Sequence, residues 1–287
     1  VNLCIPVAPL EFAIGSWGTN PPDTEYRVDF GDGFTENYTQ NELQESASYN
    51  AADPANSQNF PIPHTYTDSN CPNYSYTVFL DITTSCGTSN LTAGPIIILK
   101  KPDASFDTPP IGCINIPIQF DNTSTEGFNQ NCDTSAGYFW DFGDGNTSNL
   151  RDPFHTYNSP GIYTVSLYAQ NSCGTTNTVT KDICIESPLN PAFTLDANNG
   201  CSPFNIQTTN TTDLTDSCGG ETYLWEVSYI PAFCGTAPEQ WSFTNGTDKN
   251  SAAPSLIFNT AGTYTLTLTT TNSCGMNSNS QTIEVKQ

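Results

Sequence analysis

The sequence predicts an all-β protein built of three tandem β-sandwich domains. Three stretches rich in alternating Thr, Val, Leu and Tyr recur along the chain, and each ends in Ser-Cys-Gly. The cysteine follows the first tyrosine by ten residues in all three, over the ranges 76–86, 163–173 and 264–274. Alternation with a period of two is typical of half-buried strands, and a repeat of roughly 90–100 residues has the length of a domain rather than of a solenoid unit.

Further motifs follow the same repeat. Residues 26–33 read Tyr-Arg-Val-Asp-Phe-Gly-Asp-Gly and match residues 138–145, whereas the third copy starts alike at Tyr223 and then departs. His-Thr-Tyr follows at His64 and His155. Gly-Asp-Gly supplies the positive φ angles of a tight hairpin. No segment has a sustained helical period, so short strands joined by turns indicate a β-sandwich in each copy.

Short segments containing proline separate the copies. They lie at 99–103 and 186–191, and we expect domains at residues 1–101, 102–188 and 189–287. Because such joins are stiff and a nine-residue strand spans roughly 30 Å, three domains end to end would form a rod on the order of 100 Å long. Strands are expected at 104–107 and 192–195, before the early cysteines of copies two and three. The first copy begins only three residues before Cys4, so we expect its first strand to be missing and the chain to be part of a longer array.

The composition excludes several classes of function. Seven Lys and Arg stand against 29 Asp and Glu, which gives a formal charge of -22. Such a field repels nucleic-acid phosphates and anionic lipid surfaces. The apolar run 95–99 is only strand-sized, so membrane insertion is not expected. Eleven cysteines without a CxxC pair favour disulfides in an oxidising compartment over a zinc or redox motif.

The combined motifs resemble those of the PKD (polycystic kidney disease) domain. The second copy carries the whole pattern, from Trp140-Asp-Phe-Gly-Asp-Gly through His155-Thr-Tyr to Gly161-x-Tyr-Thr-Val. The first copy has Val28 in place of the tryptophan, and the third lacks Gly-Asp-Gly and carries an insertion at 231–240. The resemblance implies a seven-stranded, immunoglobulin-like sandwich in each copy. Trp140 and Trp225 are then the expected core aromatics.

The cysteines are expected to pair within each domain. In such a sandwich the loops gather at two ends. The loop before the Trp strand and the Ser-Cys-Gly turn share one end, and the early cysteine lies at the other. The expected bridges, each contributing about 2–4 kcal/mol, are Cys4–Cys71, Cys113–Cys184, Cys132–Cys173, Cys201–Cys234 and Cys218–Cys274. Cys86 is left unpaired, as a buried free thiol or as a link to another chain.

Two pairs of aspartates lie in the Gly-Asp-Gly turns, Asp29 with Asp32 and Asp141 with Asp144. Aspartate is favoured in turns because its carboxylate accepts hydrogen bonds from nearby backbone N–H groups, so we expect a structural role. Calcium, which prefers oxygen ligands, is the alternative for these carboxylates. His64 and His155 occupy equivalent positions and are expected to pack beside the following tyrosine. No catalytic residue and no other cofactor is expected.

Trp17 and Trp241 have no counterparts in the other copies. They are either aromatics that stack on sugar rings or local plugs under loops. The insertions at 37–59 and 231–240 are where binding specific to one domain would reside.

These features predict a non-catalytic structural and adhesive segment of a large extracellular cell-surface protein. Tandem PKD-like domains with few charges and many cysteines are similar to repeats of giant secreted adhesins, including the SprB-type gliding-motility adhesins of Bacteroidota. The expected partners are neighbouring repeats of the same chain and surface polysaccharide or other cell-surface proteins. The alternative is a carbohydrate-binding or spacer module of a secreted hydrolase.

Overall fold

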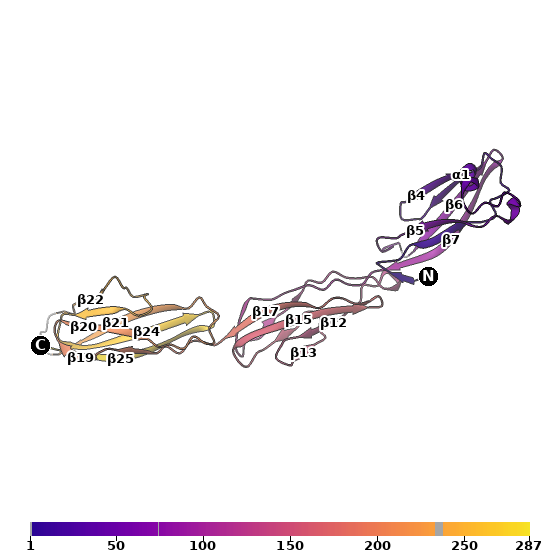
Figure 1. The fold of residues 1–287 in the computed structure, drawn as a ribbon. Helices are drawn as coiled ribbons and strands as arrows, with labels where there is room; N and C mark the ends of the chain where they lie inside the picture. Colours follow the sequence, from indigo (N-terminus) through magenta and orange to yellow (C-terminus); the bar gives the residue numbers. More distant parts are fainter. Residues whose placement is uncertain (1, 74, 233–237) are drawn as a thin grey trace.

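The computed structural model describes residues 2–73, 75–232 and 238–287. Three β-sandwich domains follow one another along an elongated molecule (Figure 1). Domains 2 and 3 lie nearly in line, domain 1 is inclined to them, and the amino terminus lies at the junction of domains 1 and 2 (Figure 1). Each domain has its own hydrophobic core. The prediction of an all-β fold with three tandem immunoglobulin-like sandwiches is confirmed.

Domain 1 contains a five-stranded sheet in the order β1-β7-β6-β3-β4 and the strand pair β2-β5. The strands are β1 (Asn2–Cys4), β2 (Leu10–Ile14), β3 (Glu25–Asp29), β4 (Thr35–Thr39), β5 (Phe60–His64), β6 (Tyr76–Thr84) and β7 (Gly87–Leu99). The insertion between β4 and β5 holds the helix α1 (Gln40–Glu45) and the 3-10 turn η1 (Pro54–Asn56). Thr39 and Glu42 start α1 with a capping box, which satisfies N–H groups at its first turn. Among the described residues, no helix is long and apolar enough to cross a membrane.

Domain 2 has its main sheet in the order β13-β12-β15-β17-β9, with β16 paired to β15, and two small pairs, β8 with β11 and β10 with β14. Its strands are β8 (Phe106–Asp107), β9 (Ile111–Cys113), β10 (Ile118–Gln119), β11 (Asp121–Asn122), β12 (Gly137–Asp141), β13 (Thr147–Ser148), β14 (Phe154–His155), β15 (Gly161–Asn171), β16 (Gly174–Thr175) and β17 (Val179–Glu186). A 3-10 turn, η2 (Gln130–Cys132), precedes the Trp strand β12.

Domain 3 packs the sheet β18-β20-β23-β22 against the sheet β19-β25-β24-β21. Its strands are β18 (Phe193–Leu195), β19 (Asn199–Cys201), β20 (Phe204–Asn210), β21 (Thr222–Pro231), β22 (Trp241–Thr244), β23 (Ser255–Phe258), β24 (Gly262–Asn272) and β25 (Gly275–Lys286). β8 and β18 are the strands expected before the early cysteines of these two domains, and the described part of domain 1 starts at β1.

One pairing recurs in all three domains. The strand that carries the early cysteine runs parallel to the last strand, as β1 with β7, β9 with β17 and β19 with β25. The early cysteine therefore ends its strand beside the end of the domain, at the point where the chain leaves for the next one. The expected core tryptophans are confirmed: Trp140 is 2% exposed and Trp225 is 1% exposed.

Domain 1 replaces the missing core tryptophan with Trp17. Val28 occupies the strand position of Trp140 and Trp225. Trp17 comes from an earlier loop, is 1% exposed, and donates its indole N–H to the Gln58 carbonyl oxygen at 3.0 Å. Its ring contacts Tyr49 of the insertion and Phe60 at the start of β5. The insertion thus closes over a large aromatic that the repeat motif does not supply.

The Gly-Asp-Gly turns need glycine for two different reasons. Gly143 and Gly145 both have positive φ, 79° and 90°. A Cβ on Gly143 would lie 2.6 Å from the Thr164 carbonyl oxygen, whereas a Cβ on Gly145 would meet nothing within 4 Å. Gly31 and Gly33 in domain 1 repeat this difference. The first glycine therefore allows a close approach of two backbones, and the second only a left-handed conformation.

We expect Gly143→Ala to destabilise domain 2 clearly more than Gly145→Ala. Both variants bear the roughly 1–2 kcal/mol of a left-handed alanine, and only Gly143→Ala adds the clash with Thr164. Calorimetric unfolding of the two variants, with the Gly31→Ala and Gly33→Ala pair as the matched test in domain 1, measures the difference. Equal losses within each pair would contradict this account of the turn.

Candidate functional site: the bridged domain junctions

The aspartates of the Gly-Asp-Gly turns stabilise the turns. Asp141 accepts the Gly143 N–H at 2.9 Å, and Asp144 accepts the Asn146 N–H at 3.0 Å. Asp29 and Asp32 make the equivalent contacts with the N–H groups of Gly31 and Phe34. Within the described residues no group of three or more His, Cys, Asp and Glu side chains is placed to hold a metal ion. The carboxylates for which calcium was the alternative are thus engaged by the N–H donors of their own turns.

The two histidines complete the same turns. In domain 1 the Nε2 atom of His64 lies 2.7 Å from the Asp32 carboxylate, and in domain 2 the Nε2 atom of His155 lies 2.8 Å from the Asp144 carboxylate. Each ring stacks on the phenylalanine of the turn and meets the following tyrosine edge-on, as the packing prediction requires. Burial opposes ionisation of Asp144, but hydrogen bonds from Asn146 and His155 outweigh it and hold its pKa below the usual value. Both histidines therefore serve the fold.

The two tryptophans without counterparts differ in exposure. Trp17 is buried, so of the two interpretations the local plug describes it and sugar stacking does not. Trp241 is half-buried and meets Phe243 edge-on, with 5.4 Å between ring centroids, against the core of domain 3. Trp17 therefore offers no exposed ring to a sugar.

Two disulfides join domain 1 to domain 2. Cys4 bonds Cys173, and Cys71 bonds Cys132, with Cα–Cα distances of 5.5 and 5.4 Å. In the first bond, Cys4 is the last residue of β1 and Cys173 lies in the turn after β15. The second pair joins the loop before β6 to the turn η2 before the Trp strand. The far end of one sandwich is thus covalently attached to the near end of the next.

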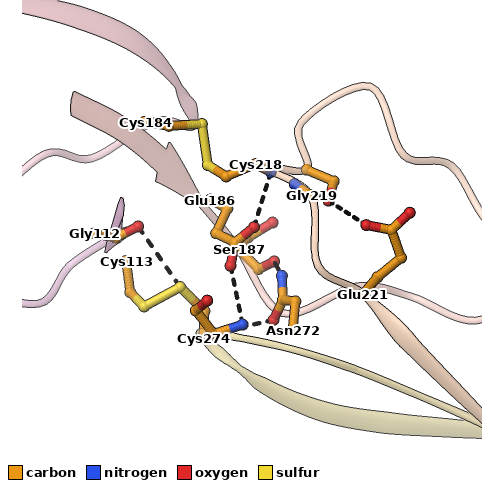
Figure 2. The surroundings of a disulfide bond; sticks show 12 residues. Gly112, Cys113, Cys184, Glu186, Ser187, Cys218, Gly219, Glu221, Asn272 and Cys274 are labelled. Carbon is orange, nitrogen blue, oxygen red and sulfur yellow. Dashed lines mark hydrogen bonds between the residues drawn. A yellow bond between two sulfur atoms is a disulfide. The ribbon is translucent and has the colours of Figure 1, made fainter. Parts of the chain in front are cut away.

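Two more disulfides join domain 2 to domain 3, as Figure 2 shows. Cys113 bonds Cys274 and Cys184 bonds Cys218, with Cα–Cα distances of 5.5 and 5.9 Å. Cys113 and Cys274 occupy the same fold positions as Cys4 and Cys173. The bridge of the early cysteine to the next Ser-Cys-Gly turn is therefore itself repeated.

The predicted pairing within domains is wrong for Cys4–Cys71, Cys113–Cys184, Cys132–Cys173 and Cys218–Cys274. The eight bonded cysteines lie at the expected ends of their sandwiches, but those that share an end do not face each other. Strand β7 lies between Cys4 and Cys71. On one edge of β7 the Leu99 carbonyl accepts the N–H of Ile5, which follows Cys4, and on the other edge the Ile98 N–H donates to the side-chain oxygen of Asn70, which precedes Cys71. On the paired strands of domain 2, Cys184 lies opposite Ile111, two residues from Cys113. Each of these cysteines instead faces the neighbouring domain across its junction.

Cys86 and Cys201 lie toward the outer ends of the molecule. Cys86 is unpaired as predicted, but it is exposed rather than buried. Cys201 carries an exposed free thiol among the described residues, and the predicted Cys201–Cys234 bridge lies outside them because Cys234 is not described.

Glu186 lies between the two disulfides of the second junction (Figure 2). It is the last residue of β17, and it is fully buried. One carboxylate oxygen accepts the Cys218 N–H at 3.0 Å, and the other accepts the Ser273 N–H at 3.1 Å. Hydrogen bonds to an ionised acceptor are stronger than neutral ones. One side chain of domain 2 therefore holds both bridged loops of domain 3.

Amide side chains of domain 3 hold the linker that enters it. Alternate residues on β25 donate to alternate carbonyls: Asn277 to Leu189, Asn279 to Pro191, and Gln281 to Phe193. Asn272 adds a bond to the Ser187 carbonyl at 2.7 Å. Because every second residue of β25 bonds every second residue of the linker, the linker runs along β25 as an extended segment. The segment leaving domain 2 is thereby fixed along its length.

The first linker is held by backbone pairing instead. Lys100 and Phe128 exchange both N–H to carbonyl bonds, and Asp103 and Thr125 do the same. Asn171 donates its side-chain amide to the Lys100 carbonyl at 2.8 Å, the same contact that Asn272 makes with Ser187. A Cβ on Gly127 would lie 2.3 Å from the Lys100 carbonyl oxygen, so only glycine permits this approach.

Comparison with known proteins supports the presence of PKD domains. A family model described as a PKD domain matches residues 100–185 and 234–287, so the chain contains PKD domains. A collagenase from Bacillus cereus, ColA, is 37% identical over 70 residues, which are 24% of this chain and 7% of that protein. A microbial collagenase from Vibrio alginolyticus is 48% identical over 48 residues, 17% of this chain and 6% of that protein. The chain thus spans only a small part of these relatives.

Several solved structures align with most of the chain at low sequence identity. The three N-terminal domains of the bacteriophage RB49 outer capsid protein Hoc align over 98% of this chain and 95% of that chain, at 10% identity and a TM-score of 0.40. The ectodomain of mouse nectin-like molecule 4 aligns over 99% and 96%, at 10% identity and a TM-score of 0.43. The Escherichia coli adhesin FdeC aligns over 74% of each chain, at 10% identity and a TM-score of 0.39.

Glu186→Ala should destabilise the second junction by roughly 2 kcal/mol, because it removes a charged acceptor shared by two N–H groups. Glu186→Gln should lose less, since the amide keeps one acceptor oxygen. Glu284→Ala is the matched control, because Glu284 is exposed at the outer end of β25. Urea denaturation followed by tryptophan fluorescence measures the three variants. A loss for Glu284→Ala as large as for Glu186→Ala would refute the assignment.

Proposed function

We propose that the chain is a non-catalytic, extracellular spacer that transmits tension between the ends of a large cell-surface protein, as in the stalk of an adhesin. The observation that carries the proposal is the pair of disulfides across each junction. A linker alone leaves two domains free to turn about it. A linker with two bridges gives three covalent connections, which restrict both tilt and rotation.

The bridges also give tension a short covalent route through domain 2. Force from domain 1 enters at Cys173 and leaves for domain 3 at Cys184, only eleven residues later. Eleven extended residues span at most about 40 Å. Strand β15 has the same number of residues, so the folded sandwich is already roughly 35 Å long. Domain 2 therefore has almost no length to release, even if its core unfolds.

The disulfides also support an extracellular location, because such bonds persist in oxidising compartments. The formal charge of -22 favours solubility and disfavours contact with nucleic acid or anionic lipid. Within this proposal the partners are neighbouring domains of the same kind, together with surface polysaccharide or proteins. A gliding-motility adhesin is the specific setting we propose. We assign no catalytic residue, because the aspartates and histidines of the Gly-Asp-Gly turns are hydrogen-bonded within those turns.

A second candidate is a spacer or binding module of a secreted hydrolase. The observation that favours it is the similarity to short segments of two collagenases. Sedimentation of the chain with insoluble collagen or chitin separates the candidates. Retention on either polymer at micromolar concentration would favour the hydrolase module.

Pulling the chain between Ala8 and Asp216, two exposed positions near Cys4 and Cys218, tests the stalk proposal. In the bridged chain the shortest covalent path between these two positions passes through the Cys4–Cys173 and Cys184–Cys218 bonds. This path has 17 residues, roughly 60 Å when extended. In the C184S/C218S variant it has 47 residues, so the limit rises by roughly 100 Å. We expect the shorter limit for the native chain and for a Cys86→Ser control. Extension of the native chain as far as the variant would contradict the proposal.

A further inference from the structure

The turn that carries Cys86 is built like the two turns whose cysteines form junction disulfides. In all three, the residue two before the cysteine pairs with the following glycine, as Thr84 with Gly87 in domain 1. The same residue accepts the N–H of the cysteine on its side chain: 3.2 Å for Cys86, 2.9 Å for Cys173 and 3.1 Å for Cys274. Cys173 and Cys274 are bonded to a preceding domain, whereas Cys86 is free and exposed.

Cys201 is likewise built like the early cysteines that form the other half of these bonds. It pairs with Lys286 at the end of the parallel strands, as Cys4 pairs with Leu99 and Cys113 with Glu186. The residue after each cysteine donates its N–H to that partner's carbonyl, at 3.0, 3.0 and 2.8 Å in the three domains. Cys4 and Cys113 are each bonded to the Ser-Cys-Gly turn of the next domain.

The two free thiols therefore have complementary fold positions at opposite ends of the molecule. Cys201 ends β19 beside the carboxy-terminal end, and Cys86 lies in the turn between β6 and β7, at the end of domain 1 that faces away from domain 2 (Figure 1). They cannot meet within one extended copy. When two copies are placed end to end, Cys201 of the first copy lies opposite Cys86 of the second copy. Cys113 lies opposite Cys274 in the same way at the second junction.

The charges at these ends match as well. At the second junction Glu186 of domain 2 reaches the Ser273 N–H of domain 3. The residue equivalent to Glu186 in domain 3 is Lys286, by its register with Cys201. The group equivalent to the Ser273 N–H in domain 1 is the Ser85 N–H, and it is held by the Asp23 carboxylate at 3.0 Å. An end-to-end contact thus brings Lys286 of one copy to Asp23 of the next, a pair of opposite charge.

We propose that Cys86 and Cys201 form a disulfide between copies of this chain, joined head to tail. The two thiols lose their protons and form one S–S bond, and the two electrons reduce a small-molecule disulfide such as oxidised glutathione to two thiols. Such a contact uses different surfaces on the two copies and does not close on itself, so it produces linear chains. The inference extends the proposed spacer function, because it lengthens the same bridged array.

Incubation of the oxidised chain at about 100 µM with a glutathione redox buffer tests it. We expect a ladder of dimers and longer species on non-reducing gels, lost in Cys86→Ser and in Cys201→Ser and kept in Cys234→Ser. Peptide mapping should then recover Cys86 joined to Cys201. Lys286→Glu should slow the ladder about fivefold, the scale of one exposed ion pair, and Asp23→Lys in the same chain should restore the rate.

Three results would overturn the proposal: no ladder, links between two Cys86 or two Cys201 residues, or Cys201 bonded to Cys234 within one chain. A rate unchanged by Lys286→Glu would show that the contact is not the one described. None of these outcomes bears on the bridges inside the chain, so the spacer function would stand or fall separately on the pulling experiment.

Discussion

The structure depends on one covalent constraint: cysteines at the end of one sandwich bond to cysteines at the start of the next. Each junction closes two bonds besides the backbone, so neighbouring domains have little freedom to turn. The other junction contacts rely on this arrangement. Glu186 can accept from two loops of domain 3 because both loops are bonded beside it. The amide side chains of β25 can hold the linker because the linker follows a single path.

The constraint also explains the composition of the junctions. A chain with 13% charged residues has few ion pairs available to fix its domains. Asparagine and glutamine side chains supply the donors instead, and backbone carbonyls of the linkers accept them. Such bonds are individually modest, since water competes for both partners. Because the disulfides already hold the donors and the linker carbonyls close together, forming these hydrogen bonds costs little further conformational entropy.

The sequence was sufficient to predict the sandwich, the repeat and the end at which each cysteine lies. Periodicity and turn residues are local signals, and they place Trp140, Trp225 and the Gly-Asp-Gly turns correctly. Pairing across junctions was missed because it depends on how domains stack, which no local pattern encodes. A signal was present: two cysteine positions recur in all three copies, the early cysteine (Cys4, Cys113, Cys201) and the cysteine of the Ser-Cys-Gly turn (Cys86, Cys173, Cys274), and no third position does. Glu186 was missed as a junction residue because it is specific to one copy.

Mass-spectrometric mapping of peptides cleaved without reduction, after free thiols are blocked, tests the central claim most directly. The account predicts peptides that join Cys4 to Cys173, Cys71 to Cys132, Cys113 to Cys274 and Cys184 to Cys218. Recovery of Cys4 joined to Cys71, or of Cys113 joined to Cys184, would place the bonds within domains. The junctions would then be single linkers, and the covalent basis of a stiff spacer would be contradicted.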